Sequence, residues 1–176
     1  MTDSELQQKR FIAAIIDIVV AIAIAVVFGV LSWILSFVAI RSESMALGYL
    51  PRVLGFLGAA VSLGYVLGRD IVAGGSSIGK KTQGLRVVTT AGAPIGFMDS
   101  AKRNAIFAIG SAFGLLSATL GLVPCIGDAV RCLLLPLWLL GVLAGVVAAV
   151  VEIVKISQDP EGVRFGDAFA DTRVVR

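Results

Sequence analysis

A single apolar run, residues 11–40, constrains the fold of this chain more than any other feature. Asp17 is the only charged residue within it, and two cations, Lys9 and Arg10, stand directly before it. As an α-helix such a run extends about 45 Å, which exceeds the roughly 30 Å hydrocarbon core of a bilayer. The run is also too long for the core of a cleavable signal. Residues 11–40 are therefore expected to be retained and to span a membrane.

The composition of the chain excludes several functional classes. Of 176 residues, 57% are hydrophobic and 15% are charged, which is too apolar for a soluble domain of this length. The formal net charge of +3 comes from cations between apolar runs, where they set membrane topology rather than bind nucleic acid. The chain has no histidine, which removes the usual neutral-pH acid or base and the commonest metal ligand. We therefore expect no catalytic residues, no cofactor, no metal site and no enzymatic activity.

Four apolar segments in total predict an all-α integral membrane protein, a four-helix transmembrane bundle with a small cytoplasmic β element. The chain is expected to form a single domain over residues 1–176, with spans at residues 11–40, 51–68, 101–123 and 133–156, a loop at 69–100 and a tail at 157–176. Pro51 is expected at the start of the second helix, and Asp99 or Ser100 is expected to cap the third. Stripes of small residues on these helices predict close helix packing.

The polar segments predict the topology. Residues 69–103 hold more cations than aspartates, and with the basic N-terminus and the tail they place the loop and both termini in the cytoplasm. Residues 85–90 are typical of a strand and 95–98 of a return strand. Arg173-Val174-Val175 repeats Arg86-Val87-Val88, and we expect these two segments to pair beneath the membrane.

Arg10 and Asp17 fall on the same stripe of the first span as its small residues, so both are expected to point into the bundle. A carboxylate inside a membrane costs several kcal/mol and needs a partner or a task. About 10 Å along the helix axis separates the two residues, which suits a shared third partner better than a direct pair. Glu152 is expected to form an ion pair with Lys155 at i+3.

Two smaller motifs allow more than one interpretation. Residues 74–81 imitate a phosphate-binding loop, but Lys81 stands where Ser or Thr would hold magnesium, so a basic turn against anionic headgroups is the favoured interpretation. Cys125 and Cys132 lie in or beside the second outer link. They could form a disulfide there or remain as free thiols, which behave as small apolar residues.

Several segments together resemble the RDD family of bacterial membrane proteins. These are residues 9–17, Ser77-Ile78-Gly79-Lys80-Lys81, Gly84-Leu85-Arg86-Val87-Val88, Lys102-Arg103-Asn104 and Asp171-Thr172-Arg173-Val174-Val175. The resemblance implies that Arg10 and Asp17 are the arginine and the first aspartate of the family name, and that Asp70 or Asp167 is the second. It also implies a bacterial plasma (inner) membrane and a transport function, with some members linked to sodium/proton antiport.

Two functions remain open. The charged residues that either would use are Arg10, Asp17, Asp70, Asp167 and Glu152. In the first, Asp17 binds and releases an ion or proton, Arg10 tunes its pKa, and the chain forms a homo-oligomer because one four-helix chain offers little room for alternating access. In the second, the chain is a non-catalytic scaffold or accessory subunit of a larger membrane complex, and its charges form a structural network in the lipid bilayer.

Overall fold

The computed structural model describes residues 3–42, 44–123, 127–158 and 163–175. Four helices in this part of the chain are long and apolar enough to cross a membrane, which confirms the predicted fold class. The long helices are α1 (Asp3–Ser42), α2 (Met45–Gly68), α4 (Phe97–Leu120) and α5 (Gly127–Gln158). The short elements are α3 (Ile78–Thr82), α6 (Phe165–Phe169), β1 (Arg86–Thr89) and β2 (Thr172–Val175).

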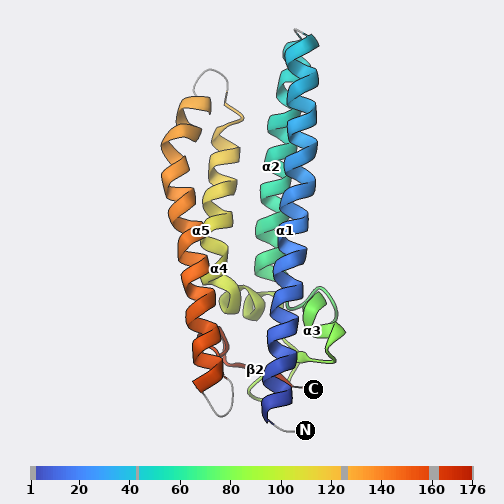
Figure 1. The fold of residues 1–176 in the computed structure, drawn as a ribbon, viewed down its shortest axis with the longest axis vertical. Helices are drawn as coiled ribbons and strands as arrows, with labels where there is room; N and C mark the ends of the chain where they lie inside the picture. Colours follow the sequence, from blue (N-terminus) through green and yellow to red (C-terminus); the bar gives the residue numbers. More distant parts are fainter. Residues whose placement is uncertain (1–2, 43, 124–126, 159–162, 176) are drawn as a thin grey trace.

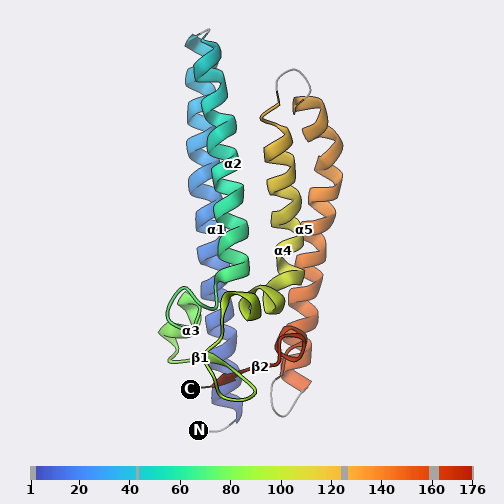
Figure 2. The ribbon, with the colours of Figure 1, turned by 180° about the vertical axis from the view of Figure 1, so that it is seen from behind.

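The long helices form two pairs. Helix α1 packs along α2, α4 packs along α5, and α2 joins the pairs through its contacts with α4. Both views show the two pairs side by side, with α3, the sheet and both ends of the chain gathered at the same end of the bundle (Figures 1 and 2). We call this the sheet end.

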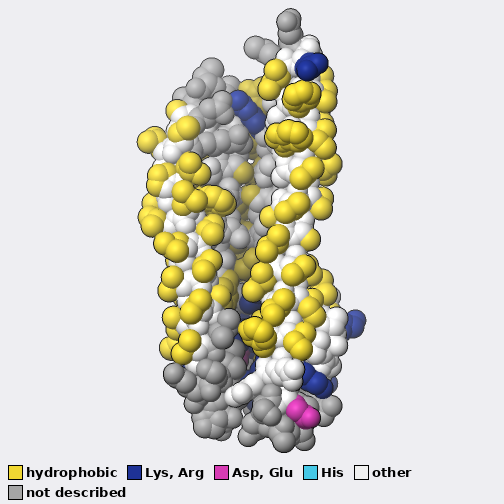
Figure 3. Space-filling model, in the orientation of Figure 1, with side chains coloured by type: hydrophobic (Ala, Val, Ile, Leu, Met, Phe, Trp, Pro, Cys, Tyr) yellow, Lys and Arg dark blue, Asp and Glu magenta, His cyan; other side chains and the backbone are white. Residues whose placement is uncertain are grey.

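The outer surfaces of the long helices are apolar. Ile22 of α1 is 56% exposed and Leu140 of α5 is 60% exposed, and similar side chains cover the helices over most of their visible length (Figure 3). Charged atoms on this face lie near the two ends or in the hollow between the helix pairs. Such surfaces are stable in contact with lipid and would be unfavourable in water.

Glycines allow the closest approach between helices. A Cβ added to Gly141 of α5 would lie 2.9 Å from the Cα of Gly110 of α4, and one added to Gly58 of α2 would lie 2.6 Å from the Cβ of Phe28. Small-residue packing is thereby confirmed at these positions. By contrast, a Cβ added to Gly64 would meet no neighbouring element within 4 Å in the described part of the chain, so close helix packing within the chain does not require this glycine.

The predicted starts of two helices were wrong. Helix α2 begins at Met45, with Ser44 as its N-cap, and Pro51 lies inside the helix. A proline in a helix removes one backbone N–H and so one hydrogen bond to the carbonyl four residues before it, which helices in lipid tolerate. Ser32 Oγ of α1 donates to the Pro51 carbonyl oxygen at 3.4 Å and links the two helices at this point. Helix α4 begins at Phe97 with Gly96 as its N-cap, and the Asp99 side chain accepts from the Gly96 N–H at 2.9 Å.

The two strands confirm the predicted pairing. Strands β1 and β2 are antiparallel, with Arg86 opposite Val175 and Thr89 opposite Thr172. The expected return strand at 95–98 was wrong because the capping interaction starts α4 there, and Pro94 forms an isolated bridge to Val88. Val87 and Val174 are part of a small core that also contains Leu85 and Ile95, with Leu6 and Ile71 packed against it.

The predicted disulfide lies partly outside the described residues. Cys125 is not among them, whereas Cys132 belongs to α5 and has an exposed side chain. Both alternatives of the sequence analysis, a disulfide or two free thiols, therefore stay predictions.

Candidate functional site

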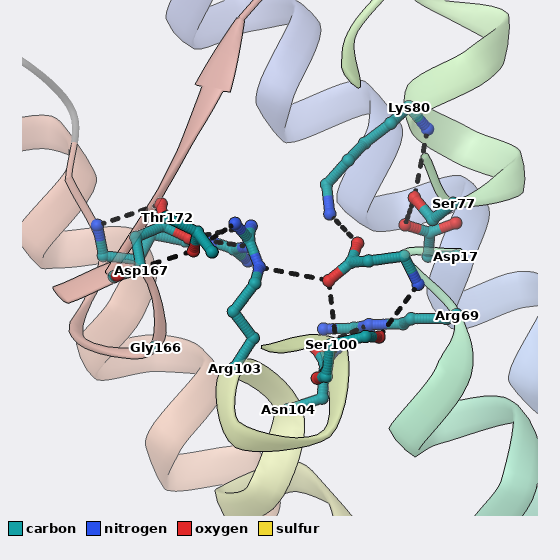
Figure 4. A network of polar contacts seen from close by, with 12 residues as sticks. Asp17, Arg69, Ser77, Lys80, Ser100, Arg103, Asn104, Gly166, Asp167 and Thr172 are labelled. Atoms are coloured by element: carbon teal, nitrogen blue, oxygen red, sulfur yellow. Dashed lines mark hydrogen bonds and ion pairs between the residues drawn. The ribbon is translucent and has the colours of Figure 1, made fainter. Parts of the chain in front are cut away.

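The acidic residues predicted as site residues are all buried at the sheet end. The exposed fractions are 3% for Asp17, 0% for Asp70, 6% for Glu152 and 2% for Asp167. Around them the structure places cations and neutral donors from α3, α4, α6 and the loops (Figure 4). We call this group the charge cluster; its charged members are Arg10, Asp17, Asp70, Lys80, Arg103, Glu152, Arg164 and Asp167.

Asp70 lies at the centre of the charge cluster, directly beyond the end of α2. Its carboxylate forms an ion pair with Lys80 of α3 and a second with Arg103, whose Nε lies 3.1 Å from Oδ2. Asn104 Nδ2 donates to the same Oδ2 at 3.0 Å. The Asp70 backbone N–H donates to Ser100 Oγ at 3.3 Å. Asp70 thus holds α3 and α4 against the end of α2.

Arg103 of α4 contacts both Asp70 and Asp167, the two candidates for the second aspartate of the family name. Its Nη2 lies 2.7 Å from Oδ1 of Asp167, while Nε contacts Asp70. Its Nη1 donates to Thr172 Oγ1 at 3.0 Å. The guanidinium is planar and carries several donors in a fixed fork, so one side chain can bind three elements at once. Figure 4 shows Arg103 directed toward Asp167 and Thr172.

Arg164 and Glu152 extend the charge cluster to the end of α5. Arg164 Nε lies 3.6 Å from Glu152 Oε2, and Arg164 Nη2 lies 3.5 Å from Asp167 Oδ1. The Gly166 N–H donates to Glu152 Oε1 at 3.1 Å. The predicted pair of Glu152 with Lys155 was wrong, because α6 brings Arg164 to the carboxylate while Lys155 Nζ lies 3.8 Å from the centre of the Phe165 ring.

Asp17 holds the N-terminus of α3. It accepts a hydrogen bond from Ser77 Oγ at 2.5 Å and another from the Gly79 N–H at 2.8 Å. Ser77 is also the N-cap of α3, and its hydroxyl accepts from the Lys80 N–H at 3.3 Å. The first amides of a helix have no partner within the helix, so a carboxylate there is favourable. The glycine-rich turn thus docks α3 onto α1.

Arg10 acts on another element. Its Nη2 donates to the Val174 carbonyl oxygen of β2 at 3.1 Å. Asp17 is buried as predicted, but the contacts described above connect it to α3, whereas Arg10 holds the sheet. The described contacts of these two charges of α1 are with different elements, β2 for Arg10 and α3 for Asp17.

Sequence reasoning missed the roles of Lys80, Arg103, Asn104 and Arg164. Arg103 and Asn104 lie in a predicted span, where polar side chains are costly unless they meet partners. That signal was present in the sequence, although nothing in it named the partners. Among the residues that the structure describes, no three histidine, cysteine or acidic side chains form a group that could hold a metal ion.

The cations keep the carboxylates of Asp70 and Asp167 ionised. Burial alone would raise the pKa of Asp70, but the charges of Lys80 and Arg103 outweigh it and hold that pKa well below its usual range. Burial would also raise the pKa of Asp167, but the charges of Arg164 and Arg103 outweigh it and lower that pKa. Burial lowers the pKa of Lys80 to about 7, with attraction to Asp70 opposing the shift and repulsion from Arg103 adding to it. Lys80 is therefore the cation of this group that most readily loses its proton.

These shifts predict a loss of stability in acid. The pKa values of Asp70 and Asp167 are lower in the folded protein than the ordinary value of 3.8, so their contribution is complete above that value and disappears as the pH falls through the folded values. Between about pH 6 and pH 3 the melting temperature in detergent is expected to fall by roughly 5–10 °C. Asp167→Asn should reduce this fall, whereas Asp171→Asn, at an exposed position, should leave it unchanged. An equal fall in both variants would contradict the prediction.

The comparison with family models covers nearly the whole chain. The model of the RDD family matches residues 7–171, a range that includes the charged members of the charge cluster and the helices that carry them. A search of curated proteins and a search of solved structures each found no match. The matched range holds α2, α4 and α5 in full and α1 from residue 7 onward, together with β1 and the glycine-rich turn. The chain belongs to the RDD family.

Proposed function

We propose that this RDD family protein is a non-catalytic, non-transporting accessory subunit of a larger membrane complex. In this proposal the charge cluster has a structural role and holds the short elements of the sheet end against the long helices. The observation that carries the proposal is the state of Asp17, which is 3% exposed and accepts hydrogen bonds from Ser77 and Gly79. A carboxylate that binds and releases an ion must exchange its partners. Here such an exchange would leave a buried hydroxyl and a buried amide without an acceptor.

The orientation belongs to the same proposal. The sheet end carries cations from α1, α3, α4 and both strands, whereas Arg41 and Arg52 lie toward the opposite end of α1 and α2. An excess of Lys and Arg is typical of the cytoplasmic side. The sheet end and both termini would then face the cytoplasm at a bacterial inner membrane.

The surface of the bundle supports a partner made of helices. A Cβ added to Gly29 of α1, Gly64 of α2 or Gly145 of α5 would have no other part of the described chain within 4 Å, apart from its own helix turn, so these glycines are open to helices from outside the chain. Small residues let helix backbones approach closely in lipid, where packing rather than hydrophobic burial drives association. Other subunits of a complex, or further copies of this chain, would fit such surfaces.

An ion pathway is the second candidate, and one observation favours it. Lys80 is 8% exposed and paired with Asp70, and its pKa is lowered to about 7 by burial. A lysine that titrates near neutral pH could take up and release a proton at the sheet end. One chain of four helices offers little room for alternating access, so this candidate requires a homo-oligomer.

Proton flux in vesicles separates the two candidates. We expect vesicles that contain only the folded protein to show no sodium- or proton-driven flux above protein-free vesicles, as reported by an enclosed pH-sensitive dye. Asp17→Asn should lower the melting temperature, because an amide is a weaker acceptor for Ser77 and Gly79 than a carboxylate.

A measurable flux would contradict the accessory-subunit proposal if it depends on the buried charges. Flux that is present in the wild type and abolished by Asp17→Asn or Lys80→Met, in protein that remains folded, would overturn the accessory-subunit proposal and establish the ion pathway. Asp171→Asn is the matched control, since it removes an exposed carboxylate at the same end of the bundle.

A further inference from the structure

A pocket of about 640 Å³ lies between α4, α5 and α6, directly beside the charge cluster. Its walls are mainly apolar and include Ile106, Ala144, Val147, Val151, Phe165 and Phe169. Val147 is 54% exposed and Phe169 is 70% exposed, so the walls are accessible from outside the bundle. The volume is in the range of pockets that bind small molecules, which is about 300–1,000 Å³.

The position of the pocket shows what surrounds it. Ile106 and Val147 belong to helices that span the membrane, while Phe165 and Phe169 belong to α6 beyond the end of α5. The pocket therefore extends from the end of the hydrocarbon layer to the headgroup region. Aromatic side chains are favoured at this depth.

The charged residues around the pocket differ in whether they already have an ion-pair partner. Arg103 and Glu152 line its inner part, but Arg103 is held by Asp70 and Asp167, and Glu152 by Arg164. Lys102 also lines the pocket, is exposed, and has no ion pair within the described part of the chain. A second ammonium, that of Lys155, lies 3.8 Å from the centre of the Phe165 ring in the pocket wall. The charge left for a ligand is positive.

From the apolar walls and the cationic rim together, we propose that this pocket binds an anionic phospholipid, with an acyl chain between α4 and α5 and the phosphate at Lys102 and Lys155. A lipid satisfies both parts of the site, because its chain removes the apolar walls from headgroup water and its phosphate meets the ammonium groups of Lys102 and Lys155. The inference is independent of whether the protein transports ions.

Native mass spectrometry of the full chain tests this site. The protein in mild detergent is incubated with phosphatidylglycerol or with phosphatidylcholine of the same acyl chains, and the lipid-bound fractions are compared. Phosphatidylglycerol is expected to be retained in preference, and Lys102→Gln should lower its apparent affinity about fivefold while leaving that of phosphatidylcholine nearly unchanged. Ala144→Phe should reduce the binding of both lipids, because the ring occupies the space of the acyl chain.

Matched controls carry the same changes away from the pocket. Lys81→Gln removes an exposed cation at the same end, and Ala23→Phe adds a ring at an exposed position of α1. Both should bind phosphatidylglycerol as the wild type does. Equal retention of the two lipids, an unchanged preference in Lys102→Gln, or full binding in folded Ala144→Phe would each overturn the proposal.

Discussion

Arg103→Met is expected to lower the free energy of unfolding by about 3–5 kcal/mol, the amount typical of breaking a buried ion pair from one side. The guanidinium is 2% exposed and lies between two carboxylates, those of Asp70 and Asp167. Without it the carboxylates keep only part of their compensation, and Thr172 Oγ1 loses its donor. Unfolding by heat or denaturant in detergent measures the change.

The other variants at this site show whether the charge or its geometry matters. Arg103→Lys should also be strongly destabilising, because a single ammonium cannot reproduce the fork that contacts Asp70, Asp167 and Thr172. Adding Asp167→Asn to Arg103→Met should recover part of the loss, since one uncompensated charge is removed. The control Lys81→Gln removes an exposed cation and should change stability by less than about 0.5 kcal/mol. A loss below about 1 kcal/mol in Arg103→Met would contradict a stabilising role for the cluster.

Gly79→Ala is expected to separate α3 from α1 and to destabilise the protein by about 2–4 kcal/mol. A Cβ at this position would overlap the Ala13 carbonyl oxygen and lie 3.0 Å from Asp17 Oδ1. Because the obstruction is backbone rather than a flexible side chain, α3 must move away. Asp17 then loses the hydrogen bonds from Ser77 and from residue 79 itself.

Hydrogen exchange localises the effect of this substitution. The amides of α3 should exchange faster in Gly79→Ala, while those in the middle of α4 and α5 should keep their protection. Gly64→Ala is the control, because it adds a methyl group to a helix at a position with nothing within 4 Å. It should be neutral or stabilising by up to about 1 kcal/mol. Equal stability of the two variants would show that the contact of α3 with Ala13 is not needed.

The spans were predictable because length and apolarity decide whether a helix can cross a bilayer. The sheet was predictable for a different reason, since Arg173-Val174-Val175 repeats Arg86-Val87-Val88, and Val87 and Val174 lie opposite each other in the same small core. In both cases the information lies in the residue pattern of the segments themselves. The burial of Asp17 followed in the same way from its place on a stripe of small residues.

The partners within the charge cluster were not predictable by such local reasoning. Glu152 and Lys155 satisfy the i+3 rule for helix pairs, yet Arg164 reaches Glu152 because α6 folds back toward α5. The contact between Arg103 and Asp167 joins residues far apart in the sequence. Spacing along one helix contains no information about such contacts, which depend on how separate elements dock.

The dependence of Arg103 on Asp167 has a consequence for biosynthesis. Ribosomes make the chain from its N-terminus, so α4 and α5 are available for insertion before α6 and β2 exist. During that interval Arg103 has Asp70 as a partner but lacks Asp167 and Thr172, and Arg10 lacks the strand whose Val174 it binds. The charges at the sheet end of the nascent protein are therefore fully paired only after residues 167–174 have been made.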